Sequence, residues 1–228
     1  MGLADLHQCL ALRERGAERH PLDRALLLAA AAVPEIAWAD RPLGARDAAL
    51  LTLRCEWFGP AFEAQVACPA CGEALTFTLD LNDFAQRAPR DEAPVTVGAA
   101  RFRRPTSRDL AALVNAVDVD AAAQRLLERL ALDGVRAWSA EERTAIEAAL
   151  DAADPLAHVT LDLACTYCAH PWSAPLDIAA SLWDEFAAQA DRLLDDVHLL
   201  AGAYGWSESE ILALPPARRQ RYIERVLS

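Results

Sequence analysis

Lysine is absent from this chain of 228 residues, so all 22 of its basic side chains are arginine. The absence excludes a Schiff-base lysine and a phosphate-binding lysine of the Walker type. Positive charge is also scarce, because 34 acidic residues leave a formal net charge of −12. A chain this acidic repels a phosphate backbone, and we therefore expect no nucleic-acid partner.

Long apolar segments are lacking too. The longest run, residues 25–33, ends at Pro34, whereas a membrane-spanning helix needs about 20 apolar residues. The opening MGLADLHQCL has no basic segment followed by an apolar one, and Leu6 stands where N-myristoylation requires Ser or Thr. We expect a cytoplasmic protein with no membrane partner.

Catalytic motifs are missing as well: the chain contains no HExxH, GxSxG, GxGxxG or Walker A sequence. Its histidines show no ligand spacing with one another: His7, His20, His158, His170 and His198. We expect His170 in a solvent-facing loop rather than as a metal ligand. The acidic pairs Asp118/Asp120 and Asp195/Asp196 are expected on solvated helix faces or caps. We therefore predict a protein that is not an enzyme and takes no small-molecule substrate.

Cysteine is the residue type that carries a recognisable pattern. Four of the six cysteines form two CxxC pairs: Cys68, Cys71, Cys165 and Cys168. In a reducing compartment this spacing favours a metal site over disulfides. The other two, Cys9 and Cys55, lie on apolar helical stretches and are expected to be small core residues.

The two CxxC pairs belong to an internal repeat. VACPAC at 66–71 aligns without a gap on LACTYC at 163–168, and LDL at 79–81 then falls on LDI at 176–178. Period-two alternation on both sides of each pair predicts strand, knuckle, strand. Four thiolates complete a tetrahedral Zn²⁺ site with no open position, which makes it structural. Residues 72–164 separate the pairs, far more than the about 15–20 of a zinc ribbon, so we predict a split module.

Two other uses of the cysteines remain open at this point. A thioredoxin-like dithiol at Cys68 and Cys71 needs a helix that begins at the first cysteine, but the residues that follow alternate as a strand. A four-cysteine site can also hold iron. We favour one structural Zn²⁺ per chain.

Hydrophobic periodicity indicates an α+β protein that is mostly α: a helical protein with a small split zinc-ribbon-like β module and an inserted helical subdomain. We expect four parts: an N-terminal helical region at 1–60, the module at 61–85 plus 156–178, the insert at 86–155, and a long helix with a helical tail at 179–228. The expected helices are 4–17, 21–33, 45–57, 107–116, 118–132, 140–153, 180–203 and 207–214, followed after Pro215 and Pro216 by a final arginine-rich helix that reaches Ser228. Residues 86–94 are predicted to be a linker, and 95–102 a short two-stranded element.

The C-terminal segment carries a family resemblance. DVHLLAGAYGWS at 196–207, EILAL at 210–214 and RRQRY at 218–222 resemble the T-even-type phage baseplate hub assembly chaperones and their relatives in phage-tail-like contractile injection systems. PLDRAL at 21–26, GARDAALL at 44–51 and CPACGE at 68–73 are similar to landmarks of the same family in the same order. One departure is CTYC at 165–168, where the family commonly has CPxC. The resemblance covers nearly the whole chain and implies a role in hub assembly without catalysis, with a baseplate hub or tape-measure protein as partner.

The tail also has the composition of a docking element, since aromatic and arginine side chains are the usual interface anchors. The candidate partner-binding residues are Tyr204, Trp206, Arg218, Arg219 and Tyr222. The alternative is ordinary helix-hairpin packing, with Trp206 on Ile211 and the arginines solvated. The competing function is a zinc-ribbon adaptor in a transcription-related or other intracellular complex, and a redox enzyme is the third and weakest class.

Overall fold

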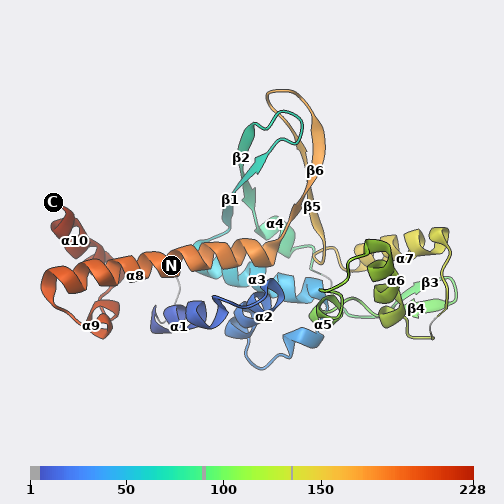
Figure 1. The fold of residues 1–228 in the computed structure, drawn as a ribbon, viewed down its shortest axis with the longest axis horizontal. Helices are drawn as coiled ribbons and strands as arrows, with labels where there is room; N and C mark the ends of the chain where they lie inside the picture. Colours follow the sequence, from blue (N-terminus) through green and yellow to red (C-terminus); the bar gives the residue numbers. More distant parts are fainter. Residues whose placement is uncertain (1–5, 89–90, 135) are drawn as a thin grey trace.

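The computed structural model of the chain describes residues 6–88, 91–134 and 136–228. The longest described helix is α8 (Ile178–Tyr204). A helical body lies along α8, two β-hairpins rise from the middle, an inserted subdomain lies beyond the N-terminal end of α8, and two short helices follow its C-terminal end (Figure 1).

The helical body has three helices that pack on one another and on α8: α1 (Leu6–Gly16), α2 (Pro21–Ala32) and α3 (Leu43–Phe58). Helix α2 begins with proline, whose missing N–H costs nothing at a first helical position. Helix α3 ends at Gly59, whose φ of +84° suits glycine. Local sequence therefore fixes where these helices begin and end.

One hydrophobic core joins the helical body to α8. Leu28, Leu50 and Phe186 are fully buried in it, and each side chain of this size contributes about 1.5–3 kcal/mol when it leaves water. Helices α1 and α8 approach very closely at Gly16, where a Cβ atom would lie 2.1 Å from Cη2 of Trp183. A larger residue at position 16 would push α1 away from α8.

Each β-hairpin is a separate two-stranded antiparallel sheet. The first pairs β1 (Ala61–Ala67) with β2 (Ala74–Asp80), and the second pairs β5 (Val159–Ala164) with β6 (Pro171–Leu176). The registers match across the repeat, because Val66 faces Leu75 in the first hairpin and Leu163 faces Trp172 in the second. Each of these partners lies 97 positions from its counterpart (66 to 163, 75 to 172).

One face of each hairpin is half-buried and the other is exposed, residue by residue. In the first hairpin the half-buried side contains Phe62, Ala64 and Val66, and the same alternation leads to buried Cys68. Cys165 continues the second hairpin in the same way. In the described part of the chain no β-ladder joins the two hairpins. The module is thus a pair of hairpins that meet at their cysteine-bearing tips.

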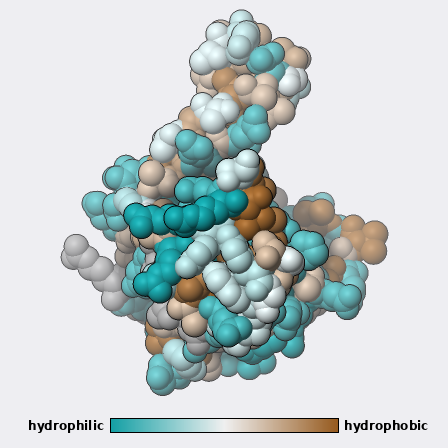
Figure 2. Space-filling view, turned by 90° about the vertical axis from the view of Figure 1, so that its left-hand side faces the viewer, coloured by the Kyte–Doolittle hydropathy of each residue, from teal (hydrophilic) through white to brown (hydrophobic). Residues whose placement is uncertain are grey.

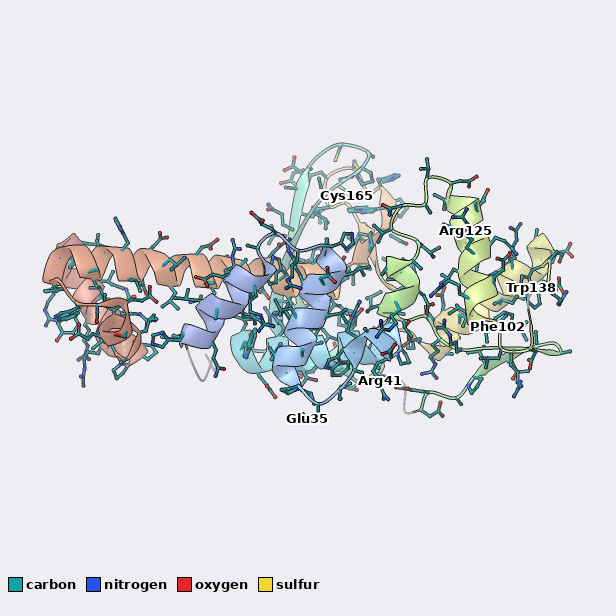
Figure 3. The ribbon with its side chains drawn as sticks, turned by 60° about the horizontal axis from the view of Figure 1, so that its bottom comes forward. Glu35, Arg41, Phe102, Arg125, Trp138 and Cys165 are labelled. Atoms are coloured by element: carbon teal, nitrogen blue, oxygen red, sulfur yellow. The ribbon has the colours of Figure 1, made fainter. Side chains whose placement is uncertain are left out.

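The inserted subdomain has its own small core. Its elements are β3 (Val95–Val97), β4 (Ala100–Phe102), α5 (Ser107–Ala111), α6 (Val119–Leu130) and α7 (Ala140–Ala153). Phe102 and Trp138 face each other with ring centroids 5.2 Å apart, between β4 and α7 (Figure 3). Leu130 and Ile146 are almost fully buried beside them.

Polar contacts join the insert to the helical body. The backbone N–H of Gly44 donates to Oδ2 of buried Asp154 at 3.1 Å, and Nη1 of Arg46 donates to Oγ of Ser107 at 2.9 Å. A Cβ at position 44 would lie 1.8 Å from Oδ1 of Asp154, so this contact depends on glycine. These hydrogen bonds attach the insert to the N-terminal end of α3.

The tail turns at the end of α8. Gly205 ends the helix in the left-handed region at φ +70°, and Ser207 opens α9 (Glu208–Leu212) with a capping box to Glu210. Helix α10 (Pro216–Leu227) then packs on α8. Leu200, Ile211 and Ile223 form a third hydrophobic cluster between the three helices.

The predicted fold class is confirmed at the level of a mostly helical protein with small antiparallel sheets. The prediction missed the short helix α4 (Asn82–Ala85) and the 3₁₀ turn η1 (Trp38–Asp40), and the helix expected at 107–116 ends at Ala111. Residues 89–90 of the expected linker and residues 4–5 of the first expected helix lie outside the described residues. Ala88 packs on the main core and Glu92 pairs with Arg41, so part of the expected linker is attached to the body. Among the described residues, no helix combines the length and hydropathy required to cross a bilayer.

Candidate metal centre

A tight turn at the tip of the first hairpin presents two sulfurs. The backbone N–H of Cys68 donates to the carbonyl oxygen of Glu73 at 2.8 Å, and the N–H of Gly72 donates to the carbonyl oxygen of Cys68 at 2.9 Å. Gly72 has φ +78°, which glycine adopts without cost. The turn therefore directs Cys68 and Cys71 to the same side.

The tip of the second hairpin repeats this turn, but the position with positive φ is occupied by alanine instead of glycine. The N–H of Cys165 donates to the carbonyl oxygen of His170 at 3.0 Å, and the N–H of Ala169 donates to the carbonyl oxygen of Cys165 at 2.9 Å. Ala169 is the counterpart of Gly72 and is the one described non-glycine residue with positive φ, at +58°. That conformation costs an alanine about 1–2 kcal/mol, so the knuckle geometry is retained against local backbone preference.

The four cysteine sulfurs form one cluster, with all of them within 4.8 Å of one another. The Sγ atoms of Cys68 and Cys168 are 3.7 Å apart, and those of Cys71 and Cys165 are also 3.7 Å apart. A tetrahedral ion with metal–sulfur bonds of about 2.3 Å requires sulfur separations of about 3.8 Å. Each of these close pairs joins a cysteine of the first hairpin to a cysteine of the second, and the internal repeat relates one pair to the other. None of the four cysteines forms a disulfide. The donor set and its spacing fit a structural metal ion.

The pKa values of the clustered thiols shift in opposite directions. Backbone N–H groups of Cys168 and Tyr167 point at Cys165 and lower the pKa of its thiol to about 7. The N–H of Glu73 favours the thiolate of Cys71, but desolvation and the three neighbouring sulfurs raise the pKa of Cys71 to about 12. A bound divalent ion would stabilise the thiolate form of all four sulfurs.

The centre lies at the outer tips of the hairpins. Cys165 is labelled at this tip in Figure 3. Cys68 and Cys165 are buried, whereas Cys71 and Cys168 are exposed. The ring of His170 stacks on Trp172 instead of joining the four-sulfur cluster. No helix begins at Cys68, because the chain continues into β2, so the helix N-terminus of a thioredoxin-type dithiol is lacking there.

The remaining two cysteines lie in or against the main core. Cys9 is buried, and burial raises the pKa of its thiol to about 11. Cys55 is half-buried, and desolvation also raises the pKa of its thiol. Both side chains therefore stay protonated and pack as small hydrophobic groups.

The aromatic residues expected in a docking element contact one another, and Trp206 and Tyr222 also pack against the third hydrophobic cluster, which contains Ile211, as the helix-hairpin alternative predicts. Tyr204 and Trp206 stack with centroids 4.7 Å apart, and Tyr222 meets the edge of Trp206 at 4.9 Å. Tyr204 keeps 39% of its surface exposed, while Trp206 and Tyr222 are half-buried. This aromatic cluster lies at the C-terminal end of α8, in the turn after it and on α10, whereas the metal centre belongs to the hairpins.

Two expectations about charged residues in the tail need correction. Arg219, expected at a partner surface beside Arg218, is only 5% exposed, and its Nε donates to Oδ2 of Asp196 at 3.1 Å. Asp196, expected on a solvated helix face, is therefore the internal partner that holds α10 against α8. The two arginines differ because Arg219 lies on the side of α10 that faces α8, whereas the preceding residue, Arg218, is exposed.

The insert contains a buried carboxylate, Asp109, that no motif of the sequence predicts as a site. Asp109 is 1% exposed and accepts hydrogen bonds from Arg103, Arg129 and Thr106. Burial alone would raise its pKa, but the hydrogen bonds from Arg103 and Thr106 lower the pKa of Asp109 far below its usual range. The capping pattern PTSRD predicts its position at the start of a helix. Its two arginine partners come from the residue after β4 and from α6, and local sequence does not show these contacts.

Comparison of the chain with protein-family models, with curated proteins and with solved structures gives no match.

Proposed function

We propose that the protein is a non-enzymatic assembly factor, a chaperone for the baseplate hub of a contractile phage tail or phage-tail-like injection system, held together by one structural Zn²⁺. The supporting residues are of two kinds. Sequence segments that resemble that chaperone family follow one another in the same order. The tail, which carries the most distinctive of them, has partly exposed aromatic side chains beside exposed arginines.

Zinc is the proposed metal because four thiolates from two CxxC turns are its preferred structural ligand set. Such a site leaves no position for substrate, so its role is to hold the two hairpin tips together. The ion would close a loop that contains the whole insert, since the two CxxC pairs lie 97 positions apart (68 to 165). This arrangement requires a compartment that keeps thiols reduced, for which we propose the cytoplasm.

The observation that carries the proposed function is the aromatic cluster at the end of α8. Tyr204, Trp206 and Tyr222 lie outside the main core and pack on one another, and Trp206 and Tyr222 also contact the hydrophobic cluster of the tail. Large, rigid aromatic side chains that remain partly exposed contribute contact area at low entropic cost. An assembly factor needs such a surface to capture an unassembled component.

The experiment is capture of baseplate hub and tape-measure proteins from cells that express a contractile cluster, using the full chain as bait. The double variant Tyr204→Ala, Trp206→Ala should lose more than about 2 kcal/mol of binding free energy, as for a hot-spot pair. Leu194→Ala, also exposed on α8, is the matched control and should capture normally. Melting curves on the same samples separate lost contact from lost folding. Failure of the unaltered chain to retain any tail component would contradict the proposed function.

A second candidate is a zinc-ribbon adaptor in a transcription-related complex, favoured by the exposed position of the hairpin tips. Tyr167, between the two cysteines of the second knuckle, is 72% exposed and would be its natural contact. In the same capture experiment this function predicts transcription components instead of tail components. Tyr167→Ala would then abolish capture, and the double tail variant would leave it intact.

A further inference from the structure

Helix α10 carries a stripe of exposed arginines. Arg218, Arg221 and Arg225 are exposed and follow one another at spacings of three and four residues. At 100° per residue they lie within about 60° of the helix circumference. Buried Arg219 and Ile223 occupy the opposite side, against α8. The three arginines therefore form one outward-facing row, which we call the arginine stripe.

The arginine stripe contrasts with the charge of the molecule. Helix α10 has four arginines and one acidic residue, Glu224, in a chain of net charge −12. Among the described residues, Arg219 is the arginine of α10 that forms an ion pair, and the arginine stripe has no carboxylate partner. Figure 2, which looks at the tail end of the molecule, shows strongly hydrophilic side chains gathered on this face beside a small hydrophobic group.

The stripe borders the aromatic cluster. The guanidinium carbon of Arg225 lies 5.9 Å from the ring centroid of Tyr222, which in turn contacts Tyr204 and Trp206. Charged and aromatic groups are thus adjacent on one surface. Arginine beside tyrosine and tryptophan is the composition of an interface core with a charged rim.

We propose that the arginine stripe and the aromatic cluster together bind an acidic amphipathic helix of the partner protein, with its carboxylates on the stripe and its apolar side chains on the aromatic rings. The inference rests on the proposed function, because it takes the partner to be a hub or tape-measure component. Charge complementarity argues for this occupant. A row of guanidinium groups spaced by helical turns matches carboxylates spaced by helical turns, and each group can bind a carboxylate in bidentate fashion.

The direct test uses a synthetic helical peptide with glutamates along one face and leucines along the other. We expect the full chain to bind it, with an affinity that falls as salt rises. The triple variant Arg218→Glu, Arg221→Glu, Arg225→Glu should bind at least about tenfold more weakly. The matched control Arg15→Glu, Arg125→Glu, Arg192→Glu changes net charge equally at exposed positions elsewhere and should bind within about twofold of the parent.

Each contrary outcome overturns the inference. These outcomes are no binding of the glutamate peptide at low salt, equal binding of its lysine counterpart, equal weakening by both triple variants, or binding of a DNA duplex in place of the peptide. Capture of tail components separates the two proposals. If the stripe variant captures a tail component as well as the parent does, the function stands and the stripe assignment is wrong. If the peptide binds through the stripe and no tail component is captured, the function is wrong and the stripe assignment stands.

Discussion

At position 169 the structure places an alanine in the left-handed backbone region, which the sequence pattern does not predict. The repeat has Gly72 in its first half and Ala169 in its second, and both have positive φ. Sequence alignment of the CxxC pairs predicted the two knuckles, but no propensity rule places alanine in the left-handed region. The turn is imposed by the hydrogen bonds of Cys165 and by the position of its sulfur in the cluster.

A reciprocal pair of substitutions tests this strain. Ala169→Gly should raise the free energy of unfolding by about 0.5–1 kcal/mol, because relief of the left-handed strain exceeds the added chain entropy of glycine. Gly72→Ala should lower it by about 1 kcal/mol, and a Cβ at position 72 meets no atom within 4 Å, so the cost is purely conformational. Urea unfolding of both variants measures these changes. A loss of stability in Ala169→Gly would contradict the assigned backbone conformation.

Arg219 provides a second prediction at this scale. Arg219→Ala removes the ion pair with Asp196 and should cost about 1–3 kcal/mol, because the arginine is buried and hydrogen-bonded. Arg218→Ala, at the exposed neighbouring position, should change stability by less than about 0.5 kcal/mol. Limited proteolysis should cleave the Arg219→Ala tail faster than the parent tail. Equal stability of the two variants would show that Arg219 does not hold α10 on α8.

At the scale of elements, the hairpins and helices follow closely from periodicity and caps. Alternation predicted β1, β2, β5 and β6, and capping boxes located α7 and α9. Sequence could not show that the hairpins form two separate sheets, since strand pairing depends on contacts between distant segments. It also missed α4 and η1, because four-residue and three-residue helices are set by tertiary packing of residues such as Phe84 and Trp38 on the main core.

The proposed ion would couple the two hairpins at the cysteine cluster. Cys165→Ser removes one ligand of the proposed ion and should cost about 3 kcal/mol or more, with release of the constraint across the insert. Cys55→Ser is the matched control, since Cys55 lies on α3 and outside the cluster, and it should retain the metal. Thermal unfolding compares the two variants. If Cys165→Ser melts at the parent temperature, the centre has no structural role.

The insert should have an acid-sensitive stability that depends on Asp109. Its folded-state pKa is lowered, so its contribution is present above the unfolded-state pKa near 3.8 and is lost as pH falls below about 4. Asp109→Asn should cost about 3 kcal/mol at neutral pH, because it leaves Arg103 and Arg129 without their shared carboxylate, and should flatten this acid dependence. Asp133→Asn, in an exposed pair with Arg101, should cost less than about 1 kcal/mol. Unfolding curves between pH 3 and 7 measure both.

At the scale of the whole molecule, α8 joins the main cluster to the tail cluster, polar contacts join the insert to the helical body, and the cysteine centre brings together the tips of two hairpins that both pack on the main cluster. The sequence predicted the four cysteines of that centre because they recur with identical spacing. It could not predict the burial of Arg219 or the approach of Gly44 to Asp154, since each depends on which helix face meets a distant segment. The proposed partner surface therefore differs from the one the sequence implied: it loses Arg219 and consists of the aromatic cluster and the exposed arginines of α10.

The most direct test of the central claim is elemental analysis of the full chain purified under reducing conditions without added metal. The account predicts about one zinc per chain, and loss of that zinc in Cys165→Ser but not in Cys55→Ser. If the analysis finds about one iron per chain instead, the four-cysteine metal centre is confirmed but the bound metal is iron. A folded chain without bound metal, with Cys68 and Cys71 joined in a disulfide, would contradict it.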